Sequence, residues 1–234
     1  MNDVMLSRLK QLKLSGIIKT FETRNEQAIK ENLSYVEFFE LLLTDEISNR
    51  QNNSIKKRMS KAKFPQIKTL EEHQFSFQPS INKNFIYNLA TCEFVRKKEN
   101  IVFIGPPGTG KTHLAIALGI KAISQGYRVL FTTVNEMLKE LYISRADNSF
   151  TQKLKYYTTP ELLILDELGL KKLNQNSVDN FYEVISKRYK NGFIIITSNK
   201  VFENGEESFM ILCWLVLYLI GLCITVIANI NKKD

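Results

Sequence analysis

The sequence predicts an α/β fold, in which a parallel sheet carries helices on both faces and follows a small all-α N-terminal domain. Apolar runs of strand length alternate with helical patterns at 101–105, 128–133, 161–166 and 193–198. Strands that alternate with helices form parallel sheets with right-handed crossovers. With 234 residues and 44% hydrophobic content, the chain is long enough for one α/β domain and a smaller appendage.

Residues 1–68 are expected to form the helical N-terminal domain. Apolar residues recur there at helical spacing, beginning with Met5, Leu6, Leu9 and Leu12. Ser34 and Glu37 fit a capping box ahead of an apolar run, so the last of about three helices should begin near Ser34. This domain is expected to bind DNA or a partner.

The stretch from residue 50 to residue 68 contains basic residues and no acidic residue. Its basic residues are Arg50, Lys56, Lys57, Arg58, Lys61, Lys63 and Lys68. The net charge of +8 and pI near 9.3 favour an acidic partner such as nucleic acid. Two interpretations stay open, a solvated helix face and a contact of the first six residues with DNA phosphates. No base-reading motif is visible, so DNA binding should tolerate many sequences.

Residues 69–95 should form a linker and a helix, because Pro79-Ser80 precedes a helical stretch from 81 to 95. Residues 96–203 should form the core with the predicted sheet. Thr133 and Glu136 fit a second capping box, which predicts a helix running to about Arg145.

A glycine-rich segment in the core fits the phosphate-binding pattern G-x-x-x-x-G-K-[ST]. It consists of Gly105, Pro106, Pro107, Gly108, Thr109, Gly110, Lys111 and Thr112. An apolar strand precedes it and a helical pattern follows, so backbone N–H groups and the helix N-terminus can hold phosphate. Lys111 should reach the β- and γ-phosphates and Thr112 should bind Mg²⁺, which makes ATP and Mg²⁺ the expected cofactors.

Two further strand ends carry candidate catalytic residues. Asp166 and Glu167 follow an apolar strand, and parallel strands deliver such carboxylates to the edge that holds the phosphate loop. Asp166 is placed to complete the Mg²⁺ shell, and Glu167 to orient the attacking water. Asn199 follows the last predicted strand and is placed to contact the γ-phosphate or the water. An ordinary strand-end turn is the alternative for Asn199.

These residues together resemble the AAA+ ATPases of the IstB/DnaC-like group, which contains transposition helper proteins of insertion sequences and related loaders of the replicative helicase. The core part of the resemblance rests on Phe103 to Ala115, Leu163 to Gly169, Ile185 to Tyr189 and Ile196 to Asn199. The N-terminal part rests on Leu9 to Gly16, Leu33 to Tyr35 and Pro79 to Lys83, and it favours the transposition helper over the helicase loader. The resemblance runs from about residue 5 to residue 203.

The resemblance implies an ATPase that oligomerises with ATP on double-stranded DNA and recruits or stimulates a transposase. It also implies that an arginine from a neighbouring subunit completes each site. Whether Arg188 or another arginine has this role stays open. A helicase loader is the alternative close in chemistry.

Residues 204–234 depart from the family. The stretch from Phe209 to Ile230 has no charged residue, so by hydropathy it is a candidate membrane span. At this place the resemblance implies a soluble segment instead, which contains an Asp-Arg pair and is followed by a final strand. A shifted reading frame can spell a similar segment, so we prefer a frameshift as the origin of this tail over a membrane anchor. The core is then incomplete: the edge beside the phosphate-loop strand should be unpaired, and ATP binding and hydrolysis should be impaired.

Other functions remain open beside the transposition helper. A membrane-anchored nucleotide-binding protein would use the apolar tail as its span, although we do not expect the membrane as a partner. A non-catalytic remnant would bind DNA through the N-terminal domain alone. The cysteines Cys92, Cys213 and Cys223 lack metal-ligand spacing and no signal peptide opens the chain, so a cytoplasmic location is expected.

Overall fold

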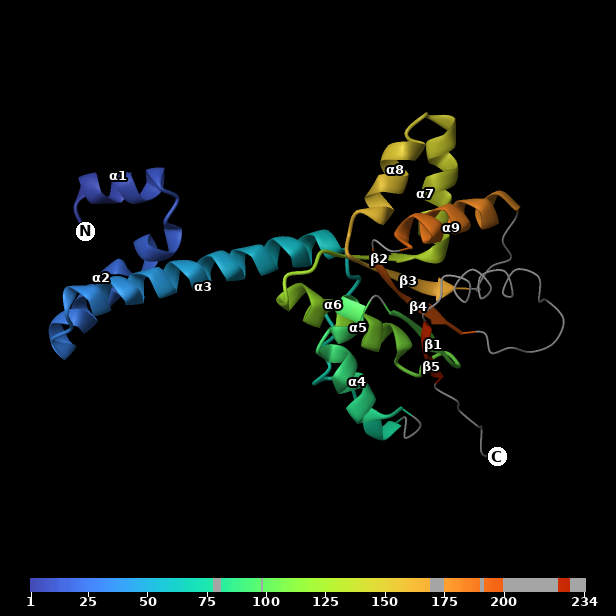
Figure 1. Ribbon diagram of the computed structural model, residues 1–234, viewed down its shortest axis with the longest axis horizontal. Coiled ribbons are helices and arrows are strands. Elements are labelled where there is room, and N and C mark those ends of the chain that lie inside the picture. Colours follow the sequence, from blue (N-terminus) through green and yellow to red (C-terminus); the bar gives the residue numbers. More distant parts are fainter. Residues whose placement is uncertain (78–80, 98, 169–174, 190–191, 200–222, 228–234) are drawn as a thin grey trace. The chain divides into compact units, whose positions relative to one another are not determined.

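The computed structural model describes residues 1–77, 81–97, 99–168, 175–189, 192–199 and 223–227 (Figure 1). The chain divides into two compact units, residues 1–57 and 58–234. The helices α1 (Asp3–Gln11) and α2 (Ser15–Glu31) belong to the first unit, and α3 (Tyr35–Ala62) runs from the first into the second.

The helix α3 begins where the capping box predicts. The hydroxyl of Ser34 accepts a hydrogen bond from the backbone N–H of Glu37 at 3.3 Å, and the Glu37 carboxylate accepts one from the backbone N–H of Ser34 at 2.8 Å. Two orphan N–H groups at the helix start are thereby satisfied. The predicted start of the last N-terminal helix near Ser34 is confirmed.

A buried carboxylate joins α2 to α3. Glu46, 4% exposed, accepts hydrogen bonds from the backbone N–H groups of Gly16 at 2.6 Å and Ile17 at 3.3 Å. These are orphan donors of the first turn of α2, so Glu46 caps that helix from the neighbouring one. Beside it, Arg24 forms a two-pronged ion pair with Asp45 at 2.8 Å, which lowers the pKa of Asp45 to about 2.

The second unit continues with a short 3₁₀ turn, Phe75–Phe77, and the helices α4 (Lys83–Ala90) and α5 (Glu93–Lys97). The single helix expected from 81 to 95 is thus two helices, and the expectation was wrong there. Cys92 adopts a left-handed conformation with φ of 57°, and the hydroxyl of Thr91 accepts from the backbone N–H of Glu93 at 3.4 Å. The left-handed turn at Cys92 therefore separates the two helices.

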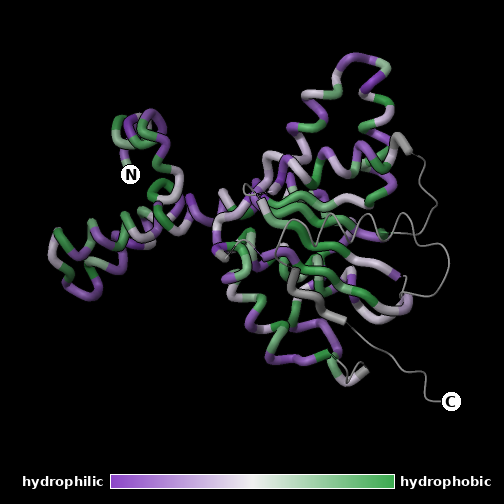
Figure 2. The backbone as a smooth tube through the Cα atoms, turned by 45° about the vertical axis from the view of Figure 1, so that its right-hand side comes forward, coloured by the Kyte–Doolittle hydropathy of each residue, from purple (hydrophilic) through white to green (hydrophobic). Residues whose placement is uncertain are grey.

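The sheet contains β1 (Asn100–Ile104), β2 (Val129–Thr133), β3 (Leu162–Leu168), β4 (Phe193–Ser198) and β5 (Cys223–Ile227). Its order is β2-β3-β4-β1-β5 and every pair is parallel. The first four strands are the predicted ones, and they read as hydrophobic segments in Figure 2.

Helices cover both faces of this sheet, as predicted. The helices α7 (Val134–Ala146), α8 (Phe150–Thr158) and α9 (Gln175–Arg188) lie on one face, and α6 (Lys111–Ser124) on the other (Figure 1). Thr133 and Glu136 form the predicted capping box of α7. On the first face, Met137, Leu141 and Phe181 pack with alternate residues of the strands, such as Leu163 and Leu165, in one buried core.

The outer edge of β1 is paired, which corrects the expectation of an open edge. Its partner β5 comes from the unusual tail, with the register running from Asn100↔Cys223 to Ile104↔Ile227. The tail sequence there is rich in β-branched residues, which favour strands, and a ladder needs only backbone groups from its partner. The rest of the apolar stretch lies outside the described residues. No helix of the described residues has the length and apolar character needed to cross a membrane.

Arg188, at the end of α9, is an internal brace of the fold. Only 1% exposed, its guanidinium donates hydrogen bonds of 2.8 to 2.9 Å to the carbonyls of Tyr157, Pro160, Glu161 and Phe193. Burial lowers its pKa to about 9, so it stays charged at neutral pH. These contacts join the end of α8 to the starts of β3 and β4. Arg188 therefore faces the interior of its own subunit, and the intersubunit role left open for it has no support.

Candidate nucleotide site

The phosphate-loop segment lies where the sequence places it, between the end of β1 and the start of α6. Gly108 and Gly110 have φ values of 81° and 83°, in the left-handed region that favours glycine. A Cβ on Gly110 would lie 2.5 Å from Cε1 of His73, so this position has no room for a side chain. The loop is also tied to β4, because the backbone N–H of Gly105 donates to the carbonyl of Ser198 at 3.2 Å.

Lys111 extends over this loop from the first position of α6. Its Nζ donates hydrogen bonds to the carbonyls of Gly105 and Pro106, each at 2.7 Å, and to the hydroxyl of Thr109 at 3.3 Å. The side chain is buried, and this burial lowers its pKa while the charge of Asp166 acts in the opposite sense. The ammonium is thus held on the loop by neutral acceptors, for which a phosphate oxygen can compete.

Thr112 and Asp166 come together from α6 and β3. The hydroxyl of Thr112 lies 2.9 Å from Oδ1 and 3.2 Å from Oδ2 of Asp166, and Asp166 is 5% exposed. A hydroxyl and a carboxylate are hard oxygen ligands of the kind that Mg²⁺ prefers. The pair predicted to hold the metal is therefore preassembled beside the phosphate loop.

Thr197 of β4 is a site residue that the sequence did not single out. Its hydroxyl donates a short hydrogen bond to Asp166 and accepts one from the backbone N–H of Glu167 at 3.0 Å. Because the hydroxyl has one proton, these two bonds fix its direction. Threonine is common in strands, so the sequence alone gives no reason to single out Thr197. The pairing of β3 with β4 brings it to Asp166 and Glu167.

A bulge in β3 places Asp166 and Glu167. The register with β4 changes between Leu165↔Ile196 and Leu168↔Ser198, so both acidic residues lie opposite Thr197. Glu167 has φ of 62°, a conformation that non-glycine residues rarely adopt. In a regular strand, successive side chains point to opposite faces of the sheet. The bulge interrupts this alternation at Asp166 and Glu167. Glu167 is half-buried at this edge.

Asn199 follows β4 at the same edge. Its neighbour Ser198 binds the loop through its carbonyl and donates its hydroxyl to the carbonyl of Leu168 at 3.0 Å. Asn199 is half-buried, and its catalytic role stays a prediction.

Two histidines lie against the phosphate loop, which the sequence did not predict. The rings of His73 and His113 are 5.0 Å apart, and Nε2 of His113 lies 2.6 Å from the carbonyl of Thr69. Burial and the neighbouring His113 lower the pKa of His73. His113 is half-buried and joins the helix after the loop to the linker segment. The linker segment from Thr69 to His73 packs directly on the nucleotide site.

The unit boundary divides the candidate DNA contacts. Arg50, Lys56 and Lys57 belong to the first unit, where Arg50 forms an ion pair with Glu46 at 2.7 Å. Arg58, Lys61 and Lys63 belong to the second unit, where they line a pocket.

The sheet and the site define the class of protein. A glycine loop after β1, with Thr112 and Asp166 beside it, on a parallel sheet of this order, is the arrangement of P-loop nucleoside triphosphatases of the AAA+ class. AMPPCP-bound DnaA from Aquifex aeolicus shares the fold, with a TM-score of 0.57 at 19% identity over 73% of this chain and 52% of that one. The chain spans about half of that protein, and the likeness concerns the fold.

Within this class, the chain belongs to the family of IstB-like ATP binding proteins, whose model matches residues 7–211. It is 39% identical over 207 residues to an ATP-binding protein of insertion sequence IS21 from Pseudomonas aeruginosa, covering 88% of this chain and 77% of that one. An ATP-binding protein of insertion sequence IS5376 from Geobacillus stearothermophilus is 39% identical over 197 residues, with coverages of 84% and 78%. The resemblance stated from the sequence is confirmed.

Proposed function

We propose that this protein is a cytoplasmic ATP-binding helper of transposition that hydrolyses ATP and binds double-stranded DNA. The observation that carries the proposal is the contact of Thr112 with Asp166 beside a phosphate loop that already holds Lys111. Support for the biological setting comes from the similar proteins of insertion sequences, which are named as ATP-binding proteins.

The residues of the loop fit the phosphates of ATP. Backbone N–H groups between Gly105 and Thr112 would receive the phosphate oxygens, and Lys111 would exchange its carbonyl acceptors for the β- and γ-phosphates. Thr112 and Asp166 would hold Mg²⁺, which supplies positive charge against the phosphates. Thr197 keeps the Asp166 carboxylate in the orientation that this role needs.

Hydrolysis requires an oriented water molecule. We assign this task to Glu167, whose half-buried carboxylate would accept a proton from the water as it attacks the γ-phosphate. Asn199, at the neighbouring strand end, would contact the same water or the γ-phosphate. An arginine from a neighbouring subunit would stabilise the developing charge, which makes turnover dependent on an ATP-driven oligomer.

DNA and a transposase are the proposed macromolecular partners. Arg50, Lys56 and Lys57, with Arg58, Lys61 and Lys63, supply the positive charge for a sequence-tolerant contact with DNA phosphates. A transposase is the enzyme that such a helper would recruit or stimulate.

This copy is proposed to be impaired, and its tail to arise from a frameshift. The strand β5 supplies a partner for β1, so the impairment would come from the missing Asp-Arg segment. Sequencing of the gene across the codons for residues 201–234 tests the origin of the tail. A sound reading frame with no alternative that encodes Asp-Arg would exclude the frameshift.

The activity is tested with two variants that separate binding from chemistry. Lys111→Ala should abolish binding of a fluorescent ATP analogue, whereas Glu167→Gln should bind it as the parent chain does and lose turnover by about a hundredfold or more. ATP turnover should rise when duplex DNA is added. Equal turnover of the parent and Glu167→Gln would contradict the assignment.

A further inference from the structure

A pocket lies at the end of the sheet opposite to the phosphate loop. Its volume is about 630 Å³, and it is lined by the first residues of β2 and by the turn before β3, including Val129, Leu130 and Pro160. The phosphate loop follows the other end of β1 in the same parallel sheet, so the two sites are separate. Every lining residue belongs to the second unit.

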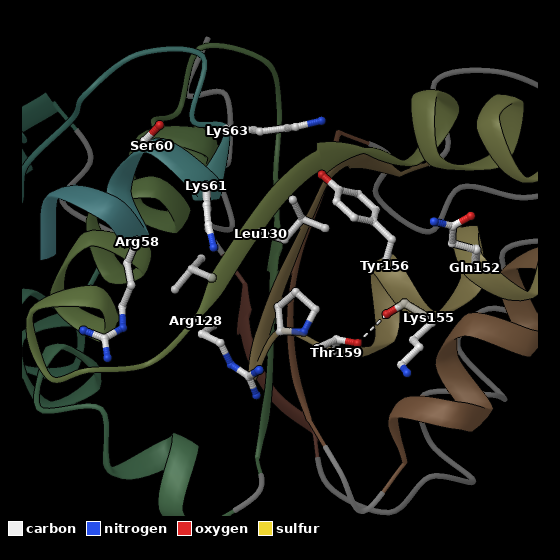
Figure 3. A pocket seen from close by; sticks show the side chains of 12 residues that line it. Arg58, Ser60, Lys61, Lys63, Arg128, Leu130, Gln152, Lys155, Tyr156 and Thr159 are labelled. Atoms are coloured by element: carbon white, nitrogen blue, oxygen red, sulfur yellow. Dashed lines mark hydrogen bonds between the residues drawn. The ribbon is translucent and has the colours of Figure 1, made fainter. Parts of the chain in front are cut away.

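The pocket combines an apolar floor with a basic rim (Figure 3). Val129, Leu130, Pro160 and the ring of Tyr156 form the apolar part. Leu130 and Tyr156 are labelled in Figure 3. Basic side chains surround it, and no lining residue is acidic: the basic residues are Arg58, Lys61, Lys63, Arg128 and Lys155. A cavity of this size with few convergent charged groups is typical of a binding site.

The basic residues are not equivalent. Arg128 is already paired with Glu161 at 2.7 Å, and Nζ of Lys63 lies 5.2 Å from the ring centroid of Tyr156. Lys61 and Lys155 are exposed, and within the part of the chain that the structure describes their side chains have no ion pair or hydrogen bond. Their charges are therefore available to an anionic ligand.

The strand β2 adds a third feature. Among the described strands it has β3 as its one neighbour, so the pocket lies at the margin of the sheet. The residues of β2 from Val129 to Thr132 are buried, so a ligand would contact this margin through the pocket and its rim rather than by extending the sheet. The contact of Phe64 with Phe131, with ring centroids 6.2 Å apart, flanks this edge without filling the pocket.

We propose that this pocket binds an extended acidic segment of a partner protein. One large apolar side chain of the segment enters between Leu130 and Tyr156, and carboxylates on either side of it pair with Lys61 and Lys155. A DNA duplex is the less suitable ligand, because its phosphates need only a basic surface and gain nothing from a recessed apolar floor. The site lies apart from the phosphate loop and goes beyond the proposed function. Arg58, Lys61 and Lys63 are also proposed DNA contacts, so the acidic segment and duplex DNA would compete for this part of the surface.

The test uses the full chain and fluorescein-labelled peptides of about ten residues. One peptide has a central phenylalanine flanked by aspartates, a second replaces the phenylalanine with serine, and a third replaces the aspartates with asparagines. The first should bind at least about tenfold more tightly than the others, because the pocket needs both the charge and the anchor.

Two variants assign the binding to the pocket. Lys155→Glu should weaken binding of the first peptide by about tenfold, and Ser60→Trp, which fills the cavity without a change of charge, should do the same. Lys139→Glu is the matched control, since Lys139 is an exposed lysine of α7 outside the pocket. It should bind the peptide within about twofold of the parent chain. Unchanged binding of the fluorescent ATP analogue shows that each variant is folded.

Each contrary outcome overturns the proposal. Equal binding of all three peptides, or of none, removes the acidic segment as the ligand. Equal effects of Lys155→Glu and Lys139→Glu place the binding elsewhere. If Lys155→Glu weakens binding of duplex DNA and leaves the peptide unaffected, the pocket belongs to the DNA surface instead.

Discussion

The hydroxyl of Thr197 on β4 donates a hydrogen bond to the carboxylate of Asp166 on β3. The same hydroxyl accepts from the backbone of Glu167, so one side chain links the residue assigned to Mg²⁺ with the residue assigned to water. This linkage holds two adjacent acidic residues of a bulged strand against one threonine of the neighbouring strand.

Thr197→Val tests this linkage. The variant has nearly the same shape, but it leaves the half-buried N–H of Glu167 without this acceptor, which should lower the free energy of unfolding by about 1 kcal/mol. ATP turnover should fall by roughly tenfold or more, because Asp166 loses the group that orients it. Urea denaturation and an ATPase assay measure the two effects. Thr197→Ser keeps the hydroxyl and should retain most of the activity, and equal losses in both variants would contradict this role.

Arg188→Leu should be among the most destabilising single changes in the second unit. It removes the donors that satisfy several buried carbonyls, at an expected loss of about 3–5 kcal/mol in the free energy of unfolding. Lys187→Leu is the control, since Lys187 is exposed and, among the described residues, pairs with Glu183 at 3.5 Å. It should change stability by no more than about 0.5 kcal/mol. Loss of oligomer-dependent turnover in Arg188→Leu at unchanged stability would instead indicate an intersubunit role.

His73 should make the site sensitive to acid. Its pKa in the folded chain lies below the ordinary value of 6.5, so the unfolded chain binds the proton more readily. Stability is therefore full above about pH 6.5 and falls as the pH drops toward the lowered pKa of the folded chain. His73→Phe keeps a ring against Gly110 and should reduce the loss of thermal stability between pH 7.5 and 5.5. An identical loss in the two proteins would show that other groups cause it.

Gly16→Ala should destabilise the first unit. A Cβ there would lie 2.7 Å from Cα of Glu46, which forces α2 away from the carboxylate that caps it. The expected loss is about 1–3 kcal/mol, although alanine is otherwise the better helix former. Limited proteolysis of residues 1–57 measures it, and binding of the fluorescent ATP analogue should be unchanged. Loss of nucleotide binding would show that the two units fold as one.

Local patterns predicted much of the fold and the nucleotide site. The strands, the capping boxes at Ser34 and Thr133, and the meeting of Thr112 with Asp166 follow from periodicity and from motifs of fixed spacing. These features depend on residues close in sequence, or on the rule that parallel strands end at one edge.

The features that the sequence left out depend on distant pairings. The partnership of Thr197 with Asp166 requires the register of β3 against β4, and the bulge at Glu167 has no local signal. Contact of His73 with Gly110 requires the linker to fold back on the loop. The pairing of β5 was missed because the tail departs from the family's final strand, so the edge of β1 was expected to lose its partner, whereas part of the apolar tail takes that place.

The position of β5 has a genetic consequence. A strand at the margin of a sheet is recruited through its peptide groups, which are the same for every amino acid except proline. A stretch translated in the wrong frame can therefore still dock, provided that it is apolar and free of proline. The last codons of such a gene can therefore change their meaning while β1 in the product still has a partner on both sides.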